Sequence, residues 1–209
     1  MAQPGAERNS LGYLYMSGEY APQRTTSPTG LDRKVGAAAR LAADSAMGDQ
    51  GPGLLLEAPG GDDGREMWRI ARDTQVLDVN SPYSYLLWCR DFADSSVVVR
   101  DGDRVCGFIT GYIRPRSAVT LFVWQVAVDQ AYRGRGLAKR MLDYLGDRVV
   151  ATGGRYLEAT VTPDNIPSSR LFEGFARDRG CAVERHTLFT TEQFPRGHQP
   201  EVLFRIGPL

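Results

Sequence analysis

The chain has 209 residues, and its 25 lysines and arginines balance its 25 aspartates and glutamates, so the net charge is zero. This balance does not favour binding to nucleic acid or to a highly charged partner, because either would call for a charge excess. No apolar run reaches the ~18 residues of a membrane helix, and no signal-peptide core precedes a cleavage site. We therefore expect a cytoplasmic protein that binds neither nucleic acid nor membrane.

The three cysteines, Cys89, Cys106 and Cys181, are widely spaced and form no Cys-x-x-Cys pair. An odd and scattered set favours neither a disulfide framework nor a zinc site, and it fits a reducing compartment. Buried apolar side chains are the simpler interpretation. No cluster of histidine, cysteine and carboxylate has the spacing of metal ligands, so we expect no metal.

Residues 1–52 are rich in Gly, Ala, Pro, Ser and Thr and poor in large apolar residues. Such a segment cannot bury enough surface to offset its chain entropy, which predicts a disordered N-terminal extension. The alanines within 31–47 favour a transient helix. A mitochondrial presequence is opposed by the acidic residues of the segment, and a true start at Met16 or Met47 is a further alternative. The folded domain is expected over 53–209.

The first half of this domain predicts a strand, two helices and three strands. A strand is expected at 54–56, a helix around 67–71 after the turn 60–63, and a second helix at 83–92, which Ser81 caps and Pro82 opens. Strands at 96–100 and 104–112 flank Asp101-Gly102-Asp103, a hairpin signal. The third strand, 121–128, runs into a glycine-containing loop.

The second half predicts helices alternating with strands. Apolar residues from Leu137 to Val149 recur at helical spacing, and Gly153-Gly154 follows them. A strand at 156–161, a helix at 163–177 and strands at 182–188 and 202–206 complete the chain. This order indicates an α/β or α+β fold around a mixed sheet.

The loop after the third strand has the composition of an anion-binding turn. Gly134 and Gly136 permit a tight turn and place no side chain over the amides that open the next helix. Such amides bind phosphate groups, and Arg133, Arg135 and Lys139 add positive charge. The P-loop pattern needs a Gly-Lys pair that the chain lacks, and Lys139 replaces the third glycine of the dinucleotide fingerprint. A glycine-rich turn with surface arginines is the structural alternative.

The residues Arg133-x-x-Gly136-x-Ala138 after an apolar strand resemble the pyrophosphate loop of the GCN5-related N-acetyltransferases, which bind acetyl-CoA. Asn165-x-x-Ser168-x-x-Leu171-Phe172 resembles their late helix, where the asparagine supports the pantetheine arm; a plain helix cap is the alternative. Many relatives have a tyrosine acid where this chain has Phe172, which has no proton to donate.

This resemblance implies a central, mostly antiparallel sheet with one parallel pair at the cofactor cleft, flanked by about four helices. It implies that acetyl-CoA is the co-substrate and that the following residues bind it: Val126, Val128, Arg133, Gly134, Arg135, Gly136, Ala138 and Asn165.

The runs 76–92, 121–128, 156–162 and 200–206 resemble a narrower family, the L-2,4-diaminobutyrate acetyltransferases of the route to the compatible solute ectoine. The resemblance covers about 53–209. It implies direct acetyl transfer to the terminal (N4) amine of L-2,4-diaminobutyrate, and a homodimer. An acetyltransferase for another amine and a non-catalytic acyl-CoA-binding module are the alternatives.

The reaction requires a neutral amine, and an amine with a pKa near ~10 is only about one part in a thousand neutral at pH 7. Removing its proton costs ~4 kcal/mol at pH 7, so a base is valuable. Asp78, Asp91 and Glu158 are the candidates for this task or for holding the second ammonium group. Glu158 is the first choice, and a solvated strand glutamate is the alternative. Asp78 fits turn chemistry equally well.

Three further residues are candidate substrate ligands. Tyr83 is favoured over Tyr85, since residues two apart on a helix face different ways. Trp124 either walls the acceptor site or fills the core. His198 lies in the last connection, where the related family closes the substrate site, and an exposed loop histidine is the alternative. A backbone amide near Gln125–Val126 is expected to meet the developing oxyanion.

Overall fold

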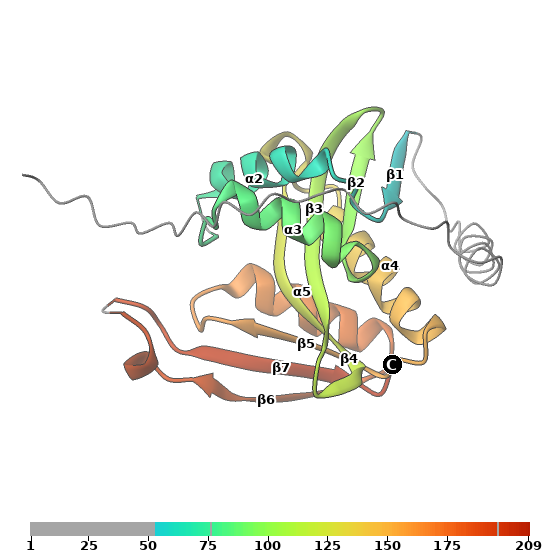
Figure 1. Ribbon diagram of the computed structural model, residues 1–209. Coiled ribbons are helices and arrows are strands. Elements are labelled where there is room, and N and C mark those ends of the chain that lie inside the picture. The colour runs from blue at the N-terminus through green and yellow to red at the C-terminus, as the bar shows by residue number, and fades with distance from the viewer. Residues whose placement is uncertain (1–52, 76, 196) are drawn as a thin grey trace, which may run out of the picture. The chain divides into compact units, whose positions relative to one another are not determined.

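The computed structural model describes residues 53–75, 77–195 and 197–209, so the predicted extension 1–52 lies outside the described part. Seven strands of the described part form one mixed sheet in the order β1-β2-β3-β4-β5-β7-β6 (Figure 1). Among these strands β4 and β5 run parallel, and the other neighbours are antiparallel. The strands are β1 (Leu54–Glu57), β2 (Val97–Asp101), β3 (Arg104–Arg114), β4 (Ser117–Val128), β5 (Tyr156–Val161), β6 (Ala182–Phe189) and β7 (Glu201–Gly207).

Four α-helices flank the sheet in the described part: α2 (Asp63–Thr74), α3 (Pro82–Asp91), α4 (Leu137–Ala151) and α5 (Ile166–Asp178). The predicted order of elements and the mostly antiparallel mixed sheet are confirmed. Several boundaries differ from the prediction by one or two residues, and two strand or helix starts differ by more. β4 begins at Ser117 rather than Leu121, and α5 begins at Ile166 rather than Pro163 because the Asn165 side chain caps it, accepting from the Ser168 amide at 3.1 Å.

The helices form two layers, one on each face of the sheet. Met67 of α2 and Tyr85 of α3 pack against Val98 and Phe108, while α4 and α5 cover the face that carries Val97. In Figure 1, α2 and α3 cross in front of β2 and β3. Because adjacent residues of β2 enter opposite cores, its first three residues, Val97 to Val99, are all apolar and buried.

The parallel pair is short and then opens. β4 and β5 are in register only from Thr120–Tyr156 to Val123–Ala159. Trp124 has no partner on β3, where the register shifts between Thr110 and Gly111, which makes it a β-bulge. Past this point β4 continues unpaired on its β5 side, and β5, β7 and β6 cross below the upright strands of Figure 1. We call the space between 124–128 of β4 and 160–161 of β5 the wedge.

The three cysteines are free thiols: Cys89 and Cys106 are buried, and Cys181 is partly exposed. The interpretation of Cys89 and Cys106 as small core side chains is confirmed. No helix among the described residues is both long and apolar enough to cross a membrane.

Candidate active site

The loop between β4 and α4 presents unpaired main-chain amides. Gly134 and Gly136 have φ of 76° and 72°, and a Cβ at either position would meet no atom within 4 Å, so the space in front of the loop is open. The first helical amide to reach a carbonyl is that of Arg140, which donates to Gly136 at 3.1 Å. Within the described part, the amides of residues 134–139, Ala138 among them, donate to no protein acceptor. The loop is therefore prepared for an anion.

Two of the three predicted cations near this loop are available. Arg133 donates only to the Val128 carbonyl, at 3.4 Å, and Arg135 lies 4.9 Å over the Tyr132 ring; neither has a carboxylate partner among the described residues. Lys139 instead pairs with two carboxylates of its surroundings, Asp143 at 2.7 Å and Asp178 at 3.2 Å. Its charge is already neutralised.

Asp129, which sequence reasoning missed, holds the start of the loop. Its buried carboxylate accepts from the Ala131 amide at 3.0 Å, from Arg69 of α2 at 2.9 Å and from Arg104 of β3 at 3.0 Å. Burial by itself raises the pKa of Asp129, but these donors outweigh it and hold the pKa below its usual value. An aspartate directly after a strand, before a turn, was the available signal.

The open edge of β4 directs main-chain groups into the wedge. The Asp129 amide donates to the Cys106 carbonyl of β3 at 2.8 Å. Because residues of an antiparallel strand alternate between facing the partner and facing away, Val128 and Val126 point their N–H and C=O away from β3. These groups have no partner strand on the wedge side past Val123.

The late helix provides a polar and an apolar group. The Asn165 carboxamide oxygen caps α5 as the cap interpretation predicted, which leaves its NH₂ without a protein acceptor in the described part. Phe172 is 3% exposed, and its ring lies 6.2 Å from that of Phe204. The side chain at the usual tyrosine position thus belongs to the core.

Three segments bring titratable groups together on the acceptor side. His198 Nε2 lies 3.9 Å from Asp78 Oδ2, in the loop before α3, and 3.9 Å from Glu201 Oε1, at the start of β7. Asp78 is almost fully exposed, whereas Glu201 is largely covered. Two predicted residues therefore meet, and the structure adds Glu201. Its only sequence signal was its place three residues after His198.

A buried hydrogen-bond chain anchors the loop that carries Asp78. The Gln125 side chain, 6% exposed, donates to the Asp78 carbonyl at 2.9 Å and accepts from the Tyr85 hydroxyl at 3.0 Å. Burial raises the pKa of the Tyr85 hydroxyl, which keeps it a donor. Asp78 is thus fixed to the strand that borders the wedge.

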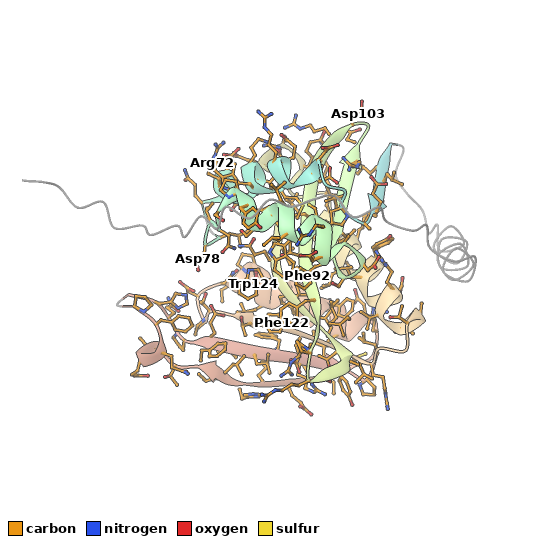
Figure 2. The ribbon with its side chains drawn as sticks, in the orientation of Figure 1. Arg72, Asp78, Phe92, Asp103, Phe122 and Trp124 are labelled. Atoms are coloured by element: carbon orange, nitrogen blue, oxygen red, sulfur yellow. The ribbon has the colours of Figure 1, made fainter. Side chains whose placement is uncertain are left out.

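Trp124 is half exposed at the bulge and also packs on a neighbour, with its ring centroid 6.2 Å from that of Trp88 in α3 (Figure 2). Trp124 therefore does not fill the core, and its role as a wall of the acceptor site stays a prediction. Tyr83 is 66% exposed, and among the described residues no hydrogen bond or aromatic pair joins it to Asp78 or Trp124. Its role as a ligand stays a prediction. Asp91 is exposed and is held by its neighbour Arg90, which lowers the pKa of Asp91.

Glu158 is buried, with 2% exposure, in the middle of β5. One carboxylate oxygen accepts from Arg114 of β3 at 2.8 Å and the other from Arg205 of β7, whose guanidinium also lies 4.0 Å over the Tyr156 ring. Both oxygens are engaged, which favours a structural role. The predicted role of Glu158 as base or ammonium anchor stays a prediction.

No group of three or more histidines, cysteines and carboxylates among the described residues could hold a metal ion. The arrangement as a whole combines an anion-binding loop and an opened strand edge with an acidic cluster, Asp78 and Glu201, that suits a cation. Such an arrangement can hold a phosphorylated carrier on one side and an amine on the other.

The chain is similar to known acetyltransferases. The chain matches the model of the Acetyltransferase (GNAT) family over residues 64–176. It is 60% identical to the L-2,4-diaminobutyric acid acetyltransferase of Streptomyces coelicolor over 159 residues, which is 75% of this chain and 94% of that protein. The corresponding protein of Virgibacillus pantothenticus is 46% identical, over 72% of this chain and 96% of that protein.

Solved structures agree. The diaminobutyrate acetyltransferase EctA from Paenibacillus lautus, in complex with its substrate L-2,4-diaminobutyric acid and coenzyme A, superimposes with a TM-score of 0.71 at 39% identity, covering 74% of this chain and 95% of that one. A structure of yncA from Salmonella typhimurium with acetyl-CoA, 16% identical with a TM-score of 0.59 over 75% and 94% of the two chains, shares the fold. The chain therefore belongs to the acetyltransferase (GNAT) family, among the L-2,4-diaminobutyric acid acetyltransferases.

Proposed function

We infer that the protein transfers the acetyl group of acetyl-CoA to the terminal (N4) amine of L-2,4-diaminobutyrate, giving N4-acetyl-L-2,4-diaminobutyrate for ectoine synthesis. The observation that carries this proposal is 60% identity across 94% of a diaminobutyric acid acetyltransferase. The free amides of 134–139 and the acidic cluster supply the two binding functions that the reaction needs.

The coenzyme occupies the loop and the wedge in this proposal. Its diphosphate accepts from the amides of 134–139, with Arg133 and Arg135 adding charge-assisted hydrogen bonds. The pantetheine arm follows the edge of β4, pairing with Val126 and Val128, and reaches the Asn165 amide group. The Val126 N–H, which points away from β3, is the proposed donor to the developing oxyanion of the thioester.

The acceptor lies against the other side of the wedge. Asp78 and Glu201 hold its ammonium groups, and the exposed Trp124 ring forms a wall against which a cation packs favourably. The departing thiolate receives no proton from Phe172, so the attacking nitrogen or solvent supplies it.

Thiol release tests the activity. The purified protein is mixed with acetyl-CoA and a panel of amines, and free coenzyme A is measured, with the acetylated position assigned by NMR. Release with L-2,4-diaminobutyrate and acetylation at N4 are expected. Release with a different amine alone would replace the substrate, and coenzyme binding without release would indicate a non-catalytic acyl-CoA module.

We also propose a cytoplasmic homodimer in which residues 1–52 form a disordered extension of the catalytic domain 53–209, as the sequence resemblance and composition imply. Light scattering should give twice the chain mass of 23.1 kDa. Limited proteolysis should remove the extension and leave acetyl transfer intact. A monomeric mass, or a protected N-terminus, would contradict the respective proposal.

A further inference from the structure

The proposed reaction needs a group that removes a proton from the acceptor ammonium, and Glu158 is poorly placed for it because arginines hold both of its oxygens. We propose that His198 is this general base, that it accepts the proton at Nε2, and that Phe194 and Gln199 are the residues that position it. This inference rests on the proposed acetyl transfer.

The first argument is the tautomer of the ring. His198 Nδ1 lies 2.5 Å from the main-chain carbonyl oxygen of Gln199. A carbonyl oxygen only accepts hydrogen bonds, so Nδ1 carries the hydrogen. In the neutral ring Nε2 is then an unprotonated acceptor, which is the state that a base requires.

The second argument is the fixed plane of the ring. His198 stacks on Phe194 with 3.9 Å between ring centroids and 13° between planes, and Phe194 meets Phe189 edge-on at 6.1 Å. The short 3₁₀ helix η3 (Thr191–Gln193) precedes Phe194 in this connection between β6 and β7. A stacked ring bound at Nδ1 retains little rotational freedom, so Nε2 keeps one direction.

The third argument is the position between donor and acceptor. The Gln199 side chain donates to Asp164 Oδ2 at 2.8 Å, which ties this connection to the turn that ends in Asn165, the proposed pantetheine contact. Asp78 and Glu201 each lie 3.9 Å from Nε2. The connection that carries the base therefore contacts both the proposed coenzyme turn and the proposed ammonium site.

Asp78 and Glu201 are the charged groups that face the ring in the described part. An ammonium bound between them is brought against Nε2. The base and the anchors thus belong to one cluster.

The step balances as follows. The terminal ammonium loses a proton to Nε2, and its nitrogen lone pair forms the new C–N bond while the thioester π pair moves to oxygen. Collapse of the tetrahedral intermediate breaks the C–S bond. The second proton of the nitrogen ends on the departing thiolate sulfur, and the imidazolium releases its proton to solvent.

The test compares His198→Gln with His186→Gln, which replaces the other histidine of the chain, an exposed residue of β6. With diaminobutyrate, His198→Gln should lower kcat about 100-fold near pH 7, the usual contribution of a general base. The deficit in kcat should shrink as the pH rises toward the amine pKa of ~10, because solvent then deprotonates the acceptor. His186→Gln should behave like the parent, and the heat of acetyl-CoA binding should be unchanged in both variants.

A deficit that is equal at all pH values, or that lies only in KM, would overturn the proposal, because it would indicate binding rather than proton transfer. His198→Asn, which keeps a donor for the Gln199 carbonyl and lacks Nε2, repeats the measurement should the glutamine variant fail to fold. Phe194→Leu should lower kcat with the same pH dependence, and Phe194→Tyr should restore it; equal activity of both would exclude the positioning role.

The two proposals fail in different ways. If the parent acetylates another amine, the proposed substrate is wrong, and the pH dependence of His198→Gln with that amine still decides the base. A parent that binds acetyl-CoA and acetylates no amine overturns both.

Discussion

Replacing Glu158 by glutamine separates a structural carboxylate from a catalytic one. The side chain is 2% exposed, and its two oxygens accept from Arg114 and Arg205. Glutamine keeps the size and one oxygen but removes the charge, which leaves two guanidinium groups around a neutral amide. We expect loss of stability without loss of the proton-transfer step.

The magnitude follows from the burial of the partners. Removing one partner of a fully buried ion pair costs ~3–5 kcal/mol, whereas an exposed pair contributes about 0–1 kcal/mol. The arginine side chains are 40% and 28% exposed, so water compensates part of the loss and about 2 kcal/mol remains. For a chain of this size that lowers Tm by roughly 4–8 °C.

Thermal unfolding followed by circular dichroism, together with the pH dependence of kcat, checks the expectation. Glu184→Gln is the matched control, because Glu184 is the exposed register partner of Arg205 on β6 and should change stability by less than about 0.5 kcal/mol. An unchanged Tm combined with a displaced pH profile would refute the reasoning and return Glu158 to the role of base.

Three further predictions concern the coenzyme loop and the acceptor wall. Arg133→Glu should weaken acetyl-CoA binding about tenfold or more, since a charged hydrogen bond contributes ~1.5–3 kcal/mol. Gly136→Pro should abolish binding, because proline cannot adopt φ of 72°. Heats of acetyl-CoA binding equal to those of the parent in calorimetry would contradict both predictions. Trp124→Phe should raise KM for diaminobutyrate about two- to fivefold, and an unchanged KM would limit Trp124 to packing. The pKa of Asp129 is lowered in the folded state, so its stabilisation is present above ~4 and is lost as the pH falls through the folded pKa. The difference in unfolding free energy between parent and Asp129→Asn should therefore shrink in acid, and a constant difference measured by urea titration would exclude this linkage.

The elements and the coenzyme loop could be predicted because their signals are local. Gly134 and Gly136 indicate a turn with positive φ, and the alternation of strands and helices around them indicates a mixed sheet. The start of α5 was misplaced because proline at 163 and the asparagine cap at 165 are both helix-start signals, and only the folded backbone distinguishes them.

The acceptor side could be predicted only in part, because its partners are distant in sequence. Glu158 was predicted as the base or the ammonium anchor, but its partners Arg114 and Arg205, which favour a structural role, lie 44 and 47 residues away. Glu201 and Gln125 gain significance only through contacts with His198 and with the Asp78 loop. Pairings of this kind follow from tertiary structure and leave no periodic trace in the chain.

The shortness of the β4–β5 pairing has a consequence for the thermal stability of the protein. Strand pairing joins the two halves of the sheet only from Thr120–Tyr156 to Val123–Ala159 in the described part. A ligand bound in the wedge would contact both halves and so add to this short connection. At a concentration of one hundred times its Kd, such a ligand raises the unfolding free energy by about 2.7 kcal/mol. Acetyl-CoA bound in the wedge as proposed would therefore raise the temperature at which the enzyme unfolds.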